Sequence, residues 1–238
     1  TTNTAGGEKN IAVGNYALDA LTSGDANTAL GYLALSANTT ASSNVAVGAY
    51  ALGDNTTGAD NAAIGRRALT SCTTASNNTA VGKSALYTMT GSGGTAIGYL
   101  ALYANQSAAN NVAVGYQSLT ANTTGTPNTA IGYNAMVANT TAINNTAVGY
   151  LALDAQTSGN GRNTCLGHQA GSAITSGDKN TVLGTSCGET LETNSNCSVI
   201  GYSAEPSSNS ATNQITLGDG NVDNLRCDDT SISTLSDE

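Results

Sequence analysis

Residues able to carry out catalysis are few and isolated in this sequence. His168 is the only histidine, so one chain cannot supply a His-based catalytic pair or a multi-histidine metal cluster. The acidic residues of positions 1–188 stand singly among turn residues, as in Thr22–Asp25. Sugar-cleaving enzymes need paired carboxylates, and calcium needs several oxygen ligands. We therefore expect no enzymatic activity, no cofactor and no metal site.

Residues suited to binding are more regular. Four tyrosines recur at a fixed spacing of 17 residues, and three basic residues precede them: Arg66, Arg67, Lys83, Tyr99, Tyr116, Tyr133 and Tyr150. A row of aromatic rings stabilises a stack of repeats, and it can also stack against sugars beside cations that meet anionic glycans. We take these seven residues as the candidate ligand-binding site, with cell-surface polysaccharide as the partner.

Two further residue types have a chemical alternative. The five cysteines, Cys72, Cys165, Cys187, Cys197 and Cys227, fit no zinc or redox spacing. We expect mostly free thiols, with an interchain disulfide at Cys227 as the alternative. Adjacent threonines recur, and regular threonine arrays on a flat surface are one route to ice binding: Thr39/Thr40, Thr56/Thr57, Thr73/Thr74, Thr123/Thr124 and Thr140/Thr141.

The composition excludes several classes of protein. Charged residues make up 10% of the 238 residues, and there is no Trp or Phe, so a wide globular core cannot be filled. Residues 1–188 carry seven acids and six bases, and residues 189–238 carry nine acids and one base, which gives −1 and −8. We expect no nucleic-acid binding, which needs clustered cations, and no membrane insertion, which needs about 18 consecutive apolar residues.

One glycine recurs along the whole chain. It occupies thirteen positions, spaced by 17 residues apart from one interval of 16 and one of 18: Gly14, Gly31, Gly48, Gly65, Gly82, Gly98, Gly115, Gly132, Gly149, Gly167, Gly184, Gly201 and Gly218. The preceding residue is always aliphatic, the one before that is usually Ala, and Asn commonly lies four positions before the glycine. Ala-Leu commonly follows, and turn-forming residues complete each unit.

A unit of this length fits one coil of a parallel β-solenoid. We expect an all-β fold of about thirteen 17-residue coils, each with a strand before the glycine, a bend at it, a short Ala-Leu strand and a polar turn. Coils about 4.8 Å apart would make a rod of roughly 60 Å. Because both the Ala and the aliphatic column are apolar, one face of the strand needs a cover, and further copies of the chain would supply it.

The repeat resembles a known family. Units such as Asn78–Gly82 followed by Ala85-Leu86 are similar to the head repeats of YadA-type trimeric adhesins and to repeats of phage and viral tail fibres, over residues 10–218. The resemblance implies a left-handed β-roll in a homotrimer with adhesive or spacer duty. Three copies of His168 meeting at the trimer axis could then hold an ion, although a surface position is the simpler expectation.

The C-terminal end resembles a second element of such fibres. Residues 213–220, 225–227 and 230–238 are similar to the stretch before an endosialidase-type intramolecular chaperone, which implies a processing point at Ser236-Asp237. We expect a rod over residues 1–220 and an acidic segment over 221–238 that leads to a downstream domain. The predicted function is a shaft, with host-surface recognition, in a virion tail fibre or at a cell surface. The alternatives are a bacterial trimeric adhesin head and an ice-binding solenoid.

Overall fold

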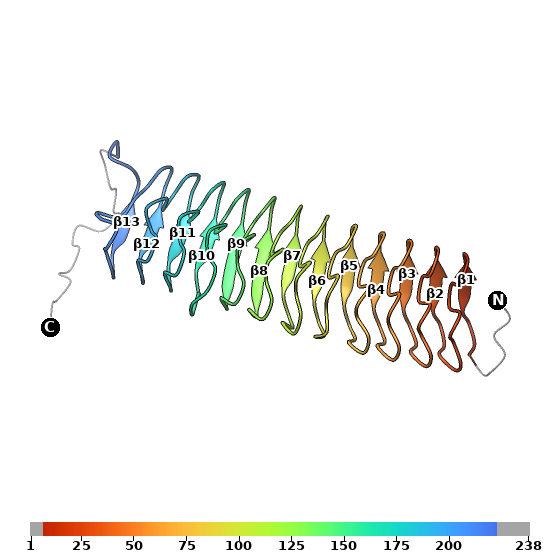
Figure 1. Ribbon diagram of the computed structural model, residues 1–238. Helices are drawn as coiled ribbons and strands as arrows, with labels where there is room; N and C mark the ends of the chain where they lie inside the picture. Colours follow the sequence, from red (N-terminus) through yellow and green to blue (C-terminus); the bar gives the residue numbers. More distant parts are fainter. Residues whose placement is uncertain (1–6, 223–238) are drawn as a thin grey trace, which may run out of the picture.

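The chain forms a straight rod of stacked coils, each carrying one short strand (Figure 1). This computed structural model describes residues 7–222. The thirteen strands are β1 (Ile11–Val13), β2 (Thr28–Leu30), β3 (Val45–Val47), β4 (Ala62–Ile64), β5 (Thr79–Val81), β6 (Thr95–Ile97), β7 (Val112–Val114), β8 (Asn128–Ile131), β9 (Asn145–Val148), β10 (Thr164–Leu166), β11 (Thr181–Leu183), β12 (Ser198–Ile200) and β13 (Ile215–Leu217). The all-β, parallel β-solenoid prediction is confirmed.

The strands make one parallel sheet in sequence order, and equivalent residues of adjacent coils are paired. Ala29 pairs with Ala46, which is 17 residues away. The 16-residue coil keeps this register, with Ala80 opposite Ala96. The 18-residue coil also keeps it, with Ala147 opposite Cys165. The turns therefore absorb the change in coil length, and the columns of the sheet continue unbroken along the rod.

In each strand the residue two positions before the repeat glycine points into the rod, and the residue directly before the glycine points outward. Ala113 is fully buried, whereas Ile97 and Ile131 in the neighbouring strands leave 41% and 39% of their surface exposed. The interior is narrow, so Ala fits the strand column, and a Leu or Met four residues after the repeat glycine fills the remaining space. The predicted placement of the Ala column inside the rod is thus confirmed.

The repeat glycine lies where adjacent coils come into backbone contact. Gly132 has a φ of 139°, a region that side-chain-bearing residues rarely adopt. A Cβ atom at this position would lie far closer to the carbonyl oxygen of Gly149 in the next coil than van der Waals contact allows. Both constraints recur along the column and explain why no other residue type replaces this glycine.

The predicted Ala-Leu strand is wrong. Across residues 7–222, this part of the coil is a run of turns. Leu35 has a φ of 50° and Leu33 a φ of 54°, and a left-handed conformation cannot belong to an extended strand. Left-handed residues with side chains cost energy, and coil-to-coil hydrogen bonds offset it: the Leu35 N–H donates to the Ala51 carbonyl at 3.0 Å.

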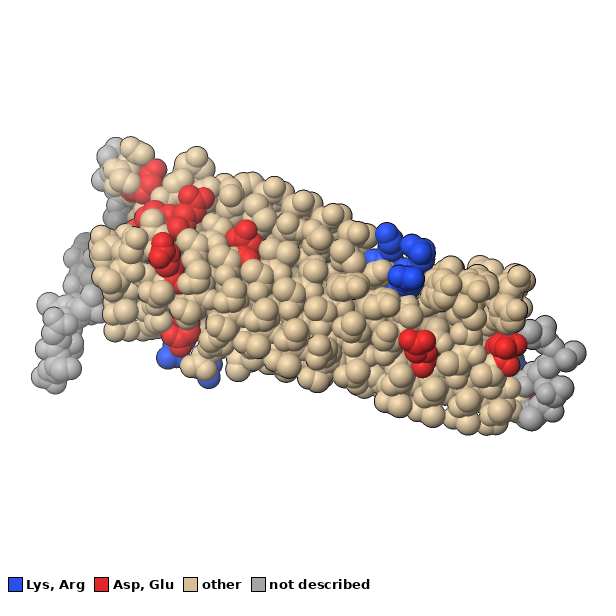
Figure 2. Space-filling model, viewed as in Figure 1, with Lys and Arg blue, Asp and Glu red and all other residues tan. Residues whose placement is uncertain are grey.

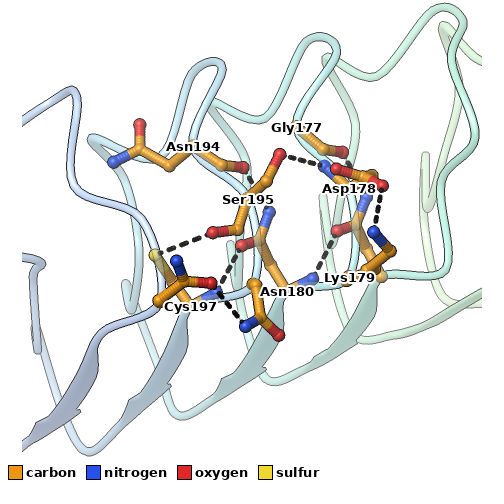
Figure 3. A network of polar contacts seen from close by, with 10 residues as sticks. Gly177, Asp178, Lys179, Asn180, Asn194, Ser195 and Cys197 are labelled. Carbon is orange, nitrogen blue, oxygen red and sulfur yellow. Dashed lines mark hydrogen bonds and ion pairs between the residues drawn. The ribbon is translucent and has the colours of Figure 1, made fainter. Parts of the chain in front are cut away.

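The asparagines four residues before the glycine form a buried ladder between coils. The Asn27 Oδ1 accepts the backbone N–H of Asn44 at 3.0 Å, and the Asn27 Nδ2 donates to the Ala41 carbonyl at 2.8 Å. Figure 3 shows the same arrangement near the other end, where Asn180 accepts the N–H of Cys197 at 2.9 Å and donates to the Asn194 carbonyl at 2.7 Å. Each amide satisfies backbone groups that the narrow interior shields from water.

A second asparagine column was not recognised in the sequence. It lies seven residues after the repeat glycine and includes Asn38 and Asn55, both fully buried. The Asn55 Oδ1 accepts the Gly58 N–H at 3.1 Å, and its Nδ2 donates to the Gly58 carbonyl at 2.9 Å. This ring closes the polar turn of its own coil. The spacing from Asn55 to Gly58 was visible in the sequence, but asparagine is common enough in turns to hide it.

Candidate functional site

The outer face of the sheet carries an unbroken apolar column, which we call the aliphatic ridge. It consists of the residue before each repeat glycine: Val13, Leu30, Val47, Ile64, Val81, Ile97, Val114, Ile131, Val148, Leu166, Leu183, Ile200 and Leu217. Nine of these side chains are exposed, including Val13 at 55% and Leu166 at 46%, and the other four are half-buried. Large contiguous apolar surfaces on a folded chain usually mark an interface.

The tyrosine ladder lies two residues beyond this ridge, and its rings face one another. Ring centroids are 5.1 Å apart from Tyr99 to Tyr116 and from Tyr116 to Tyr133, and 5.2 Å apart from Tyr133 to Tyr150. The planes of the last two pairs differ by 6° and 12°. His168 continues the stack 5.0 Å beyond Tyr150. The structure therefore brings the four predicted tyrosines together and adds His168, which we had expected simply at the surface.

This stacking determines which part of each ring can meet a ligand. Both faces of Tyr116 and Tyr133 are covered by neighbouring rings, and the Lys83 Nζ lies 5.4 Å from the centre of Tyr99 at the open end. A sugar cannot insert between rings that are about one coil spacing apart. The ladder therefore exposes the edges of its rings to solvent. This geometry indicates that the rings stabilise the stack of coils and do not stack against sugar rings.

The three predicted basic residues lie together in two adjacent coils. Arg66, Arg67 and Lys83 are all exposed. The N–H of Ser84 donates to the carbonyl of Arg66 at 3.0 Å, which places Lys83 beside Arg66 in the stack. Figure 2 shows Lys and Arg atoms gathered at one place on a largely uncharged stretch of the rod, while acidic atoms concentrate toward the β13 end.

These cations have no carboxylate partner in the described part of the chain. The one ion pair within residues 7–222 joins the Lys179 Nζ to Asp178 at 3.4 Å, and Figure 3 shows it. The pKa of Asp178 is lowered from its ordinary value, mainly by a hydrogen bond with the hydroxyl of Ser195. Two of the three cations instead contact rings: the Arg67 guanidinium carbon lies 5.7 Å from the centre of Tyr50, and the Lys83 Nζ lies over Tyr99.

The threonine pairs use their two hydroxyl groups differently. In four of the five pairs the first threonine donates to a carbonyl of the next coil, as in Thr39 to Thr56 at 3.2 Å and Thr123 to Thr140 at 3.0 Å. The second threonine, such as Thr40, is exposed. In these four pairs one hydroxyl is committed to holding coils together, and this was not predicted. The arrangement supplies no continuous double row of free hydroxyl groups for ice binding.

Four cysteines are free and buried: Cys72, Cys165, Cys187 and Cys197. Burial raises the pKa of Cys72 to about 11 and that of Cys187 to about 11, so both thiols stay protonated and unreactive near neutral pH. The expectation of mostly free thiols is confirmed for these four. Cys227 and the predicted processing point at Ser236 and Asp237 lie outside the described residues and stay predictions.

Within residues 7–222, no three His, Cys, Asp or Glu side chains come together as metal ligands. The same residues contain no helix that is long and apolar enough to cross a bilayer. No protein-family model, curated protein or solved structure matches this chain.

Proposed function

We propose that three identical copies of this chain form a fibre. Its role is structural and adhesive, and it is not catalytic. The observation that supports this proposal is the aliphatic ridge, which runs along the outer face of all thirteen strands. Leaving such a strip in water forfeits the free energy of burying it, about 25 cal/mol per Å² of apolar surface. A cover of the same length would recover it.

The natural cover is a second copy of the chain. A partner must present apolar groups at the coil repeat along the entire rod, and an identical solenoid does so with matching register. The number three comes from the resemblance to trimeric adhesins and tail fibres, as does the left-handed roll. The resemblance of the C-terminal end favours a phage or viral tail fibre, located on the virion, over a bacterial surface adhesin.

The test is the mass of the particle in solution and its response to charge on the ridge. Light scattering should give three times the chain mass. Ile97→Glu/Ile131→Glu should dissociate the trimer, because both side chains are already exposed in a single chain and each would place a carboxylate in the seam. Thr57→Glu/Thr124→Glu adds the same charge at exposed turn positions and should leave the trimer intact. A folded wild-type monomer would refute the proposal.

A further inference from the structure

We propose that Arg66, Arg67 and Lys83 form a docking site for an acidic polysaccharide, and that the ring faces of the tyrosine ladder take no part in it. This inference rests on the proposed fibre function for the avidity of three copies, but the chemistry of the three cations does not depend on it. It narrows the candidate site from seven residues to three and the ligand from polysaccharide in general to anionic polysaccharide.

The first support is the concentration of like charge. Arg66 and Lys83 occupy the same outer column of adjacent coils, and Arg67 lies next to Arg66. Side chains one coil apart repel one another when both are cationic. No carboxylate of residues 7–222 forms an ion pair with any of the three. A bound anion would relieve this repulsion, whereas a neutral sugar would not.

The second support is that two of these cations are held in place. Arg67 lies over the ring of Tyr50 on one side of the trio, and Lys83 lies over the ring of Tyr99 on the other. Cation–π contacts restrict long side chains that would otherwise move freely, so less rotamer entropy is lost when an anion binds. The rings of Tyr50 and Tyr99 thus position the two cations. The ring faces that the cations cover are not available to a sugar.

The third support is the size of the patch, which can hold a few anionic groups of a polysaccharide chain. Three cations within two coils are too few for a nucleic acid, whose recognition needs an extended basic surface, and the body of the chain carries a net charge of only −1. An acidic polysaccharide can place isolated carboxylates or sulfates on such a patch. In a trimer the patch is displayed three times, so weak contacts add through avidity.

The experiment measures binding of the 238-residue chain to heparin, with neutral dextran of similar length as the uncharged comparison. The wild type should bind heparin in a salt-sensitive manner and should not bind dextran. Arg66→Gln/Arg67→Gln/Lys83→Gln should lose affinity by roughly tenfold or more, since three exposed charge contacts are removed. The matched control is Arg162→Gln/Lys179→Gln, which removes basic residues from other coils and should change the affinity little.

The outcomes separate this inference from the fibre proposal. Three results would each overturn the docking site. They are heparin binding by the folded triple variant equal to that of the wild type, an equal loss of affinity in the control variant, and tighter binding of the wild type to duplex DNA than to heparin. Light scattering on the same samples reports the trimer independently. A trimer that ignores heparin would contradict only the docking site, and a monomer that binds heparin through the trio would contradict only the trimer.

Discussion

The side-chain oxygen of Asn44 accepts the backbone N–H of Asn61, one coil further along the rod, at 3.0 Å. The same side chain donates to the carbonyl of Gly58 at 2.9 Å. One buried amide therefore ties the residue before one strand to the residue before the next strand and to the turn that leads into it. Repeated along the rod, this arrangement makes each coil depend on its neighbours, as expected for a solenoid.

Asn44→Ala should destabilise the chain by about 1–3 kcal/mol, because it leaves the buried N–H of Asn61 without its acceptor. The midpoint of urea unfolding measures the change. Thr57→Ala, at an exposed turn position, is the control and should shift the midpoint little. An equal shift in both variants would mean that the asparagine ladder is not a main source of stability.

Substitution of glycines should separate two kinds of position. Gly132→Ala introduces a Cβ at a φ of 139° and against the backbone of the next coil. We expect it to lower the free energy of unfolding by at least about 1–3 kcal/mol. Gly53→Ala is the matched control, since its Cβ would make only an ordinary contact, 3.4 Å from the Tyr50 carbonyl oxygen. Equivalent positions in other coils hold Ser36 and Thr70. Gly53→Ala should be neutral or stabilising; similar losses in both would contradict this account.

The sequence allowed the solenoid, its period and the strand before each repeat glycine to be predicted, because each column has its own physical requirement. Ala113 and its equivalents had to be small to fit a narrow interior, and Gly132 and its equivalents had to be glycine. The path after the glycine could not be predicted in the same way. Leu35 reads as an ordinary strand or core residue, and nothing in its type reveals a left-handed backbone that depends on hydrogen bonds to the next coil.

The candidate site was predicted only in part for a related reason. The spacing of Tyr116 and Tyr133 showed that the two rings lie in one column, but whether ring faces or edges meet solvent depends on side-chain orientation. The isolation of Lys83 and its two basic neighbours from carboxylates likewise depends on where the scattered acids lie around the coil. Sequence spacing places residues along the rod, whereas their chemistry depends on directions that only the fold supplies.

Stability should fall at alkaline pH through the buried thiols. Burial raises the pKa of Cys72 from 9.0 to about 11, so between these values the folded chain keeps a proton that the unfolded chain has lost. The stabilisation is complete below about pH 9 and is lost as the pH rises toward 11. The urea midpoint should therefore decrease from pH 8 to pH 10 in the wild type and decrease less in Cys72→Ala. An identical decrease in both would exclude this thiol as a cause.

The tyrosine ladder should contribute to stability and not to ligand binding. Tyr116→Ala/Tyr133→Ala removes three stacked ring pairs, each worth about 0.5–1.5 kcal/mol beyond simple burial, and should lower the urea midpoint clearly. Tyr116→Phe/Tyr133→Phe keeps the rings and should stay close to wild type. Tyr202→Ala removes a ring that is 71% exposed and should have a small effect.

Heparin binding by the same variants then assigns the role of the ladder. The Phe variant should bind as the wild type does, because its rings and the three cations remain in place. If the Phe variant folded normally but lost heparin, the tyrosine hydroxyl groups would be ligand contacts. If the Ala variant kept its full stability yet lost binding, the ladder would be a recognition surface after all, and the stacking of Tyr116 on Tyr133 would have no structural consequence.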